Sequence, residues 1–146
     1  MFEKILYPTD FSDVSKKALD YIKKLKEAGT KQVILLHVID EREVEHISHI
    51  PGIHVSTQEL QGLKEEGAKE GIRAIEAELK ESGLDVKVRI ERGIPLTDIL
   101  RVEEEEGVSA IVIGSHGRSC VEEMFLGSVS ENVIRKSKKP VLVIRR

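Results

Sequence analysis

A glycine-rich loop is the segment of this sequence best suited to bind a ligand. Residues 114–128, GSHGRSCVEEMFLGS, follow the short apolar run AIVI and lead into the polar segment SVSENVIRK, which starts at Ser128. Glycine loses more backbone entropy on folding than any other residue and packs no side chain. Three glycines at this place therefore indicate that another group approaches the main chain closely.

The spacing Gly114-x2-Gly117-x9-Gly127-Ser128 favours an anion as that group. Gly114 would let the chain turn sharply off a strand, and Gly117 would expose backbone N–H groups. The next residues are expected to open a helix, whose unpaired N–H groups and positive dipole end favour a phosphate. These residues are Gly127, Ser128, Val129 and Ser130, and the two serine hydroxyls would add donors.

A second polar segment, YPTDFS at residues 7–12, follows the first apolar run of the chain. In a doubly wound sheet, ligands bind beyond the carboxyl ends of the strands, where the strand order reverses. If the first and fourth strands are neighbours at that point, the two loops flank one crevice. The sequence therefore predicts a single anion site between them.

Short apolar runs alternate with amphipathic stretches along the chain. The runs are of strand length and rich in β-branched residues; they are KILY (4–7), VILLHVI (33–39), VKVRI (86–90), AIVI (110–113) and VLVI (141–144). The stretches between them repeat apolar residues every three or four positions, as amphipathic helices do. Helix ends are predicted at Gly29, Gly83 and Gly107, and helix starts at Ser12 or Asp13 and at Pro95. This alternation predicts a parallel α/β sheet with helices on both faces.

Two of the runs are expected at sheet edges. VKVRI alternates apolar and charged residues, so Lys87 and Arg89 should face water. The last run carries no charge before Arg145, and an unprotected apolar edge invites pairing with another chain. We therefore predict a homodimer joined through residues 141–145.

One part of the chain shows no clear period. Residues 40–57 contain Pro51 and Gly52 and are interpreted as a long loop leading into the second helix. That helix contains three glycines, each costing about 1 kcal/mol relative to alanine, so its first turns are expected to be weak or irregular.

Composition excludes several classes of protein. The 146 residues suit one domain over 1–146, with 40% hydrophobic residues and no apolar stretch of membrane-spanning length. The start MFEKILYPTD does not resemble a secretion signal, so a cytoplasmic location is predicted. A net charge of -3 with mixed signs argues against a nucleic-acid partner, and Cys120 alone excludes an internal disulfide. A charged fraction of 34% with few thermolabile residues is typical of a thermophile.

The glycine spacing resembles the nucleotide motif of the universal stress protein family. ILYPTDFS, LLHV, IVIGSHG and KPVLVIRR match the family's pattern in order, so the resemblance covers the whole chain. Neither a Walker A G-x4-GK[ST] nor a Rossmann G-x-G-x-x-G occurs. The resemblance implies the ATP-binding class of the family. It also implies a doubly wound, five-stranded parallel sheet of order 3-2-1-4-5, like that of adenine nucleotide α-hydrolases, and a dimer through the last strand.

The resemblance also implies a set of ligand contacts. The ribose and phosphates would be held by Gly114, Ser115, Gly117, Arg118, Gly127, Ser128, Val129 and Ser130. The adenosine would be bordered by Pro8, Thr9 and Asp10, and the adenine pocket lined by Val38. The implied ligand is ATP or AMP, to which Mg²⁺ or Mn²⁺ would bind through the phosphates without a dedicated protein cage.

Several of these residues have a simpler interpretation. Asp10 could cap the first helix, although Ser12 and Asp13 suit that role better, and we favour a ligand role. Arg118 could be a surface residue, but beside Gly117 it has good access to a phosphate. His116 is interpreted as tolerating a turn and Cys120 as incidental.

Two further groups are interpreted as solvated. His46, His49 and His54 lack the carboxylate or thiol partners of a recognisable metal site, so a solvent-exposed loop is expected. The acidic run at residues 103–106 would end the third helix facing water, paired with nearby lysines.

Two functions remain open. In the first, the protein is a dimeric switch that binds ATP or AMP and alters its affinity for a downstream protein during stress. In the second, it is a slow ATP hydrolase or phosphotransferase using the same site. Asp10, His116 and Arg118 are the candidate groups for the second function, but they form no recognisable catalytic pair, so the binding function is preferred.

Overall fold

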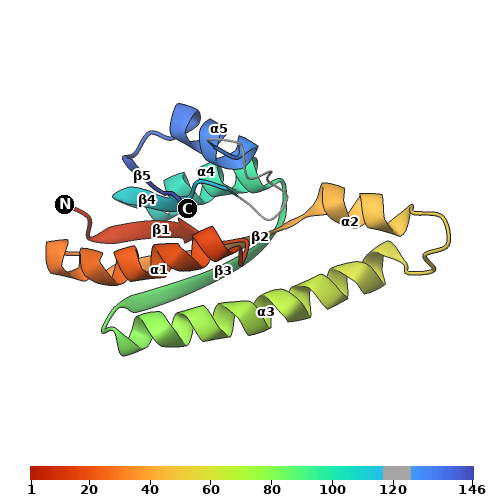
Figure 1. The fold of residues 1–146 in the computed structure, drawn as a ribbon, viewed down its shortest axis with the longest axis horizontal. Helices are drawn as coiled ribbons and strands as arrows, with labels where there is room; N and C mark the ends of the chain where they lie inside the picture. The colour runs from red at the N-terminus through yellow and green to blue at the C-terminus, as the bar shows by residue number, and fades with distance from the viewer. Residues whose placement is uncertain (117–125) are drawn as a thin grey trace.

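The computed structural model describes residues 1–116 and 126–146 as a parallel sheet with the strand order β3-β2-β1-β4-β5 (Figure 1). The strands are β1 (Lys4–Pro8), β2 (Gln32–Asp40), β3 (Asp85–Gly93), β4 (Ala110–Gly114) and β5 (Val141–Ile144). The helices are α1 (Asp13–Leu25), α2 (Glu41–Ser48), α3 (Thr57–Glu81), α4 (Pro95–Glu106) and α5 (Ser128–Lys136), with a 3₁₀ turn, η1 (Lys26–Ala28). The predicted fold and strand order are confirmed. Gly117, Arg118 and Cys120 lie outside the described residues.

The sheet separates two hydrophobic cores. On one face α1 and α3 pack through Ala18, Leu19, Ile22, Ile72, Ile75 and Leu79. On the other face α4 and α5 pack through Ile99, Val102 and Val133. β1, β2 and β4 send successive side chains to opposite faces, which is why the central residues of these strands are mostly apolar. Each fully buried aliphatic side chain contributes about 1.5–3 kcal/mol to stability.

The helix boundaries follow the predicted signals. Ser12 caps α1, where its hydroxyl accepts a hydrogen bond from the N–H of Ser15 at 3.2 Å. Pro95 is the first residue of α4, and Gly107 ends that helix with a φ of 59°. Gly83 follows α3 with a φ of 85°. These are left-handed conformations that favour glycine.

The long loop predicted at residues 40–57 is wrong over residues 41–48, which form α2, and the loop that leads into α3 is limited to residues 49–56. Asp40 caps α2 by accepting a hydrogen bond from the N–H of Arg42 at 3.0 Å. Val44 is the only buried residue of that helix, so its sequence shows no apolar period. α3 then starts with a capping box between Ser56 and Glu59 and stays regular for 25 residues, so its first turns are not irregular.

α2 and the first half of α3 project beyond the carboxyl ends of the strands (Figure 1). We call residues 41–67 the arm. The buried residues of α3 begin only at Ala68, whereas Leu63 in the arm is 67% exposed. At Gly62 and Gly67, no neighbouring atom lies within 4 Å of the position that a Cβ would occupy. The arm therefore rests on few tertiary contacts.

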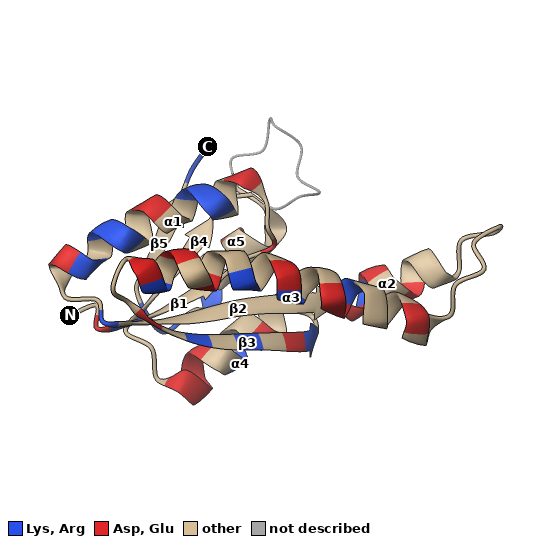
Figure 2. Ribbon diagram, turned by 90° about the horizontal axis from the view of Figure 1, so that it is seen from below, with Lys and Arg blue, Asp and Glu red and all other residues tan. Residues whose placement is uncertain are grey.

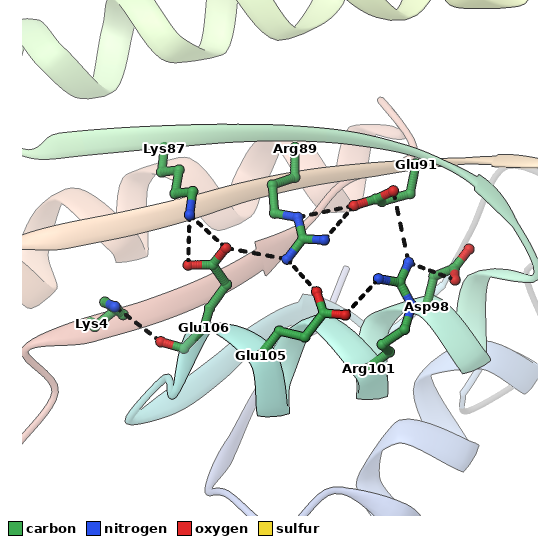
Figure 3. A network of polar contacts seen from close by, with 8 residues as sticks. All are labelled: Lys4, Lys87, Arg89, Glu91, Asp98, Arg101, Glu105 and Glu106. Atoms are coloured by element: carbon green, nitrogen blue, oxygen red, sulfur yellow. Dashed lines mark hydrogen bonds and ion pairs between the residues drawn. The ribbon is translucent and has the colours of Figure 1, made fainter.

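β3 lies at an edge of the sheet, as predicted, but its cations do not both face water. The guanidinium of Arg89 contacts Glu91, Glu105 at 2.8 Å and Glu106 at 3.2 Å (Figure 3). α4 covers this face of β3, so Arg89 is largely buried under the acidic end of that helix. Only Lys87, which pairs with Glu106 at 2.8 Å, keeps a half-exposed side chain.

The acidic end of α4 is therefore not simply a water-facing run. Glu103 is buried and accepts hydrogen bonds from the hydroxyl of Ser137 at 2.7 Å and the N–H of Lys138 at 3.1 Å. The hydrogen bond from Lys87 lowers the pKa of Glu106, and that from Arg101 lowers the pKa of Glu105. Paired cations thus offset the unfavourable placement of carboxylates at a helix C-terminus.

The outward surfaces carry charges of both signs. Lys and Arg alternate with Asp and Glu along α1 and α3 (Figure 2). Within the described part of the chain, every helix is too short or too polar to cross a membrane.

Candidate functional site

The strand order reverses between β1 and β4, and the two predicted ligand segments begin at the carboxyl ends of these neighbouring strands. Gly114 at the end of β4 lies against the start of α1. A Cβ on Gly114 would come within 3.1 Å of Cγ1 of Val14 and 3.2 Å of the backbone N of Ser15. The two segments thus border the same edge of the sheet.

This contact, rather than a sharp turn of the chain, explains why residue 114 is a glycine. Gly114 is still part of β4 and does not have a positive φ, so it makes no sharp turn. It is needed because the backbone of α1 approaches it closely, which a side chain would obstruct. The first glycine of the motif therefore serves helix–strand packing.

Thr9 shapes the β1–α1 turn from inside. Its hydroxyl oxygen accepts hydrogen bonds from the hydroxyl of Ser15 at 2.6 Å and the N–H of Phe11 at 3.1 Å. Its own N–H donates to the carbonyl of Leu36 at 2.8 Å. The Nδ1 of His37 donates to the Thr9 carbonyl at 2.7 Å, because a carbonyl can only accept. Thr9 is buried, so these bonds fix the turn and its neighbours.

Asp10 and Pro8 flank Thr9. Pro8 ends β1 and is buried opposite Leu36. A carboxylate oxygen of Asp10 accepts a hydrogen bond from the N–H of Ser12 at 3.0 Å, which closes an Asx turn ahead of α1. Asp10 therefore supports the turn, while Ser12 rather than Asp10 caps the helix.

Tyr7 anchors the turn in the core below it. Its phenol donates a hydrogen bond to the carbonyl of Ser15, and burial raises the pKa of Tyr7. The phenol therefore stays protonated as a donor throughout the ordinary pH range. The residue order Tyr7-Pro8-Thr9 thus joins a buried anchor directly to the turn at the carboxyl end of β1.

Ser115 closes the neck of the glycine loop. Its N–H donates to the carbonyl of Ile144 at 2.8 Å, and its carbonyl accepts from the N–H of Gly127 at 2.7 Å. Its hydroxyl lies 2.7 Å from Nδ1 of His116, and both side chains are buried. The chain thus leaves β4 and returns to α5 at one point, with residues 116–126 between the two ends.

α5 begins at that neck without a side-chain cap among the described residues. Gly127 is its N-cap, in an extended conformation. The hydroxyl of Ser130 donates to the carbonyl of Gly114 at 2.6 Å, which ties the first turn of α5 to β4. Ser128 is exposed, whereas Val129 packs on the α4/α5 core. Val129 can therefore offer a ligand its N–H, while its side chain serves packing.

Val38 lies on β2 beyond the end of β1. Pro8 pairs with Leu36, and β2 continues to Asp40. The end of β2 therefore extends past the β1–α1 turn, with Val38 half-buried on the α4/α5 side. A hydrophobic side chain there suits a flat apolar ring.

Sequence reasoning missed His37 and Phe11. The ring of His37 lies beside that of Phe11, with centroids 4.6 Å apart. For His37, the available signal was a histidine within an otherwise apolar strand. Phe11 had no local signal, since its role depends on packing against another helix.

The histidines of the arm lie on α2 and in the segment that follows it. Within the described residues no group of three or more His, Cys, Asp or Glu side chains could hold a metal ion. His46 lies on α2 and His49 caps its end, instead of lying in a loop as predicted.

Comparison with known proteins agrees with this architecture. The model of the universal stress protein family matches residues 1–145. The chain belongs to the universal stress protein family. It is 45% identical to universal stress protein MJ0577 of Methanocaldococcus jannaschii, over all of this chain and 96% of that protein. The solved structure of MJ0577 superposes with a TM-score of 0.88, covering 100% of this chain and 97% of that one.

More distant members of the universal stress protein family share the fold. A universal stress protein in complex with cAMP is 23% identical, with a TM-score of 0.68 over 99% of this chain and 97% of that one. A family member from Arabidopsis thaliana with AMP bound is 19% identical, with a TM-score of 0.65 over 98% and 91% of the two chains.

Proposed function

We propose that this protein binds an adenine nucleotide, ATP or AMP, in the crevice between β1 and β4 and acts as a dimeric nucleotide-dependent switch in a stress response. The observation that carries the proposal is the N-terminus of α5, which no described side chain caps. Two hydrogen bonds fix this N-terminus to the end of β4: the N–H of Gly127 donates to the carbonyl of Ser115, and the hydroxyl of Ser130 donates to the carbonyl of Gly114. A helix N-terminus held in this way is preorganised for an anion.

Each part of the ligand has a surface of matching chemistry. The N–H groups of Ser128 and Val129 at the start of α5 would bind phosphate, together with Gly117 and Arg118 of the loop. The turn at Pro8, Thr9 and Asp10 would border the adenosine, with adenine against Val38. The AMP and cAMP complexes of distant family members support an adenine base. Mg²⁺ or Mn²⁺ would enter with the phosphates.

Hydrolysis of ATP remains the alternative. Of its candidate groups, Asp10 accepts a hydrogen bond from Ser12 and His116 lies against the hydroxyl of Ser115. The Asp10 bond supports the β1–α1 turn and the His116 bond joins two side chains, and the sequence offers no recognisable catalytic pair to orient an attacking water. The binding function is therefore preferred.

The dimer is proposed to form through residues 141–145. β5 pairs on one side with β4, and its other edge faces outward at the end of the sheet. Leu142 on this strand is 41% exposed. Pairing with a second copy would cover both the edge and this side chain.

A charge placed at the start of α5 tests the site. Ser128→Asp should stabilise the helix, because a carboxylate at an N-terminus interacts favourably with the dipole. The same carboxylate should repel a phosphate and weaken ATP binding by about tenfold. Asn132→Asp adds the same charge one turn further along and is the matched control.

The measurements are calorimetric titrations and thermal unfolding with ATP, AMP, cAMP and GTP, with mass spectrometry of any nucleotide released on denaturation. A bound nucleotide raises the unfolding temperature by mass action. If none of the four nucleotides binds or shifts unfolding, the proposed function is wrong. If Ser128→Asp binds ATP as the wild type does, the start of α5 is not the phosphate site.

A further inference from the structure

Phe11 has an unusual backbone conformation. It has a φ of 64°, the only positive φ among the described residues other than glycine. A bulky L-residue rarely adopts this left-handed conformation, which persists only where the surroundings hold it. Phe11 directly follows Asp10 in the turn that borders the crevice, so whatever holds Phe11 also shapes that turn.

Within the described part of the chain, Thr9, His37 and α3 hold Phe11 in place. Its N–H donates to the hydroxyl oxygen of Thr9 at 3.1 Å. Its ring lies against the imidazole of His37, which is itself fixed by the 2.7 Å bond to the Thr9 carbonyl. The edge of the ring contacts α3 at Gly71, where a Cβ would come within 2.6 Å of Cε1 and 2.9 Å of Cδ1 and Cζ.

Gly71 is thereby distinguished from the other glycines of α3. Gly62 and Gly67 have no atom within 4 Å of a Cβ position, so alanine would fit at either place. At Gly71 a methyl group would overlap the ring of Phe11, which cannot retreat freely because His37 lies beside it. The missing side chain at residue 71 leaves a notch that the Phe11 ring occupies.

We propose that Gly71 is a positioning residue of the nucleotide site, acting through Phe11. The notch fixes the ring, the ring holds the left-handed backbone of Phe11, and that backbone places Thr9 and Asp10 at the adenosine. The inference rests on the proposed function, since it concerns the affinity of that same site. α3 thus contributes to nucleotide binding without contacting the nucleotide.

The test compares Gly71→Ala with the matched control Gly67→Ala, one turn earlier on the same helix. Both exchanges raise helix propensity equally. We expect Gly71→Ala to weaken ATP binding by about tenfold, measured by calorimetric titration, and Gly67→Ala to leave it unchanged. Equal ATP affinity of Gly71→Ala and wild type would overturn the inference. Absence of ATP binding by the wild type itself would instead overturn the proposed function.

A double-mutant cycle with Phe11→Ala identifies the route of the effect. Without the ring, the methyl group at residue 71 has room, so Gly71→Ala should change ATP affinity no further in the Phe11→Ala background. A persistent tenfold loss in that background would show that Phe11 is not the intermediary and would overturn the inference. If Gly71→Ala does not fold, Phe11→Ala alone tests the inference, because this exchange must also weaken ATP binding by about tenfold. Wild-type ATP affinity of Phe11→Ala would overturn the inference.

Discussion

Gly114 and Val14 meet where the last residue of β4 passes the first turn of α1. A Cβ on Gly114 would lie 3.1 Å from Cγ1 of Val14 and 3.4 Å from its carbonyl carbon. This close approach brings the end of β4 and the start of α1 together at one edge of the sheet. The first glycine of the motif is therefore a requirement of packing before it is a requirement of ligand binding.

Gly114→Ala should destabilise the protein by about 1–3 kcal/mol, because the added methyl group overpacks the α1–β4 contact. Urea unfolding measures the change. Gly62→Ala is the control, because nothing lies within 4 Å of a Cβ there and the helix should gain about 1 kcal/mol. Wild-type stability of Gly114→Ala would contradict this account of the contact.

Arg89→Met should lower the free energy of unfolding by about 1–3 kcal/mol, since Glu91 and Glu106 stay partly buried but lose the guanidinium that pairs with them. Arg135→Met removes an exposed helix pair with Glu131 and should cost less than about 0.5 kcal/mol. Urea unfolding of both variants gives the comparison. Similar losses from the two exchanges would mean that the β3–α4 network is no stronger than a surface pair.

Acid should weaken the same network. The pKa values of Glu105 and Glu106 in the folded protein are lowered by hydrogen bonds from Arg101 and Lys87, respectively. Their contribution is therefore complete above the unfolded-state pKa of 4.5 and is lost as the pH falls through the lower folded values. Urea midpoints between about pH 6 and pH 3 should fall less steeply for Lys87→Met than for wild type. Parallel curves would exclude a role for the Glu106–Lys87 pair.

Leu142→Lys should convert the proposed dimer to monomers, because it places like charges together at a shared edge. Leu142 is a better site for this test than Val143, whose side chain packs on the α4/α5 core. Leu63→Lys, in the arm, is the control for a charge at an exposed leucine. Sedimentation velocity reports the mass, and a persistent dimer of Leu142→Lys would place the interface elsewhere.

The sheet was predictable because its signals are local. Apolar runs such as those of β2 and β4, and caps such as Ser12 and Gly107, depend on few neighbours. α2 was not predicted because it buries only Val44. The burial of Arg89 was not predicted because the alternation of charged and apolar residues in β3 does not reveal that α4 covers one face of this edge strand. Amphipathic pattern predicts elements that contribute to the core and overlooks those that do not.

The positions of the segments around the proposed site were predictable, whereas their hydrogen bonds were not. The β1–α1 turn and the start of α5 lie at the predicted edge of the sheet, but the residue types alone did not show how each side chain is used. The hydroxyl of Ser130 donates to Gly114, and Thr9 is engaged by Ser15, Phe11 and His37. Such tertiary hydrogen bonds depend on the relative placement of distant segments, for which a single sequence contains no period or spacing.

The projection of α3 past the sheet has a consequence for engineering. The helix is about 37 Å long at 1.5 Å per residue, and its buried residues begin only at Ala68, near its middle. The tip of the arm, at Pro51 and Gly52, is exposed and remote from both cores. Peptide tags or whole domains can therefore be inserted at this tip without interrupting either hydrophobic layer, which makes it a suitable attachment point for a fluorescent label.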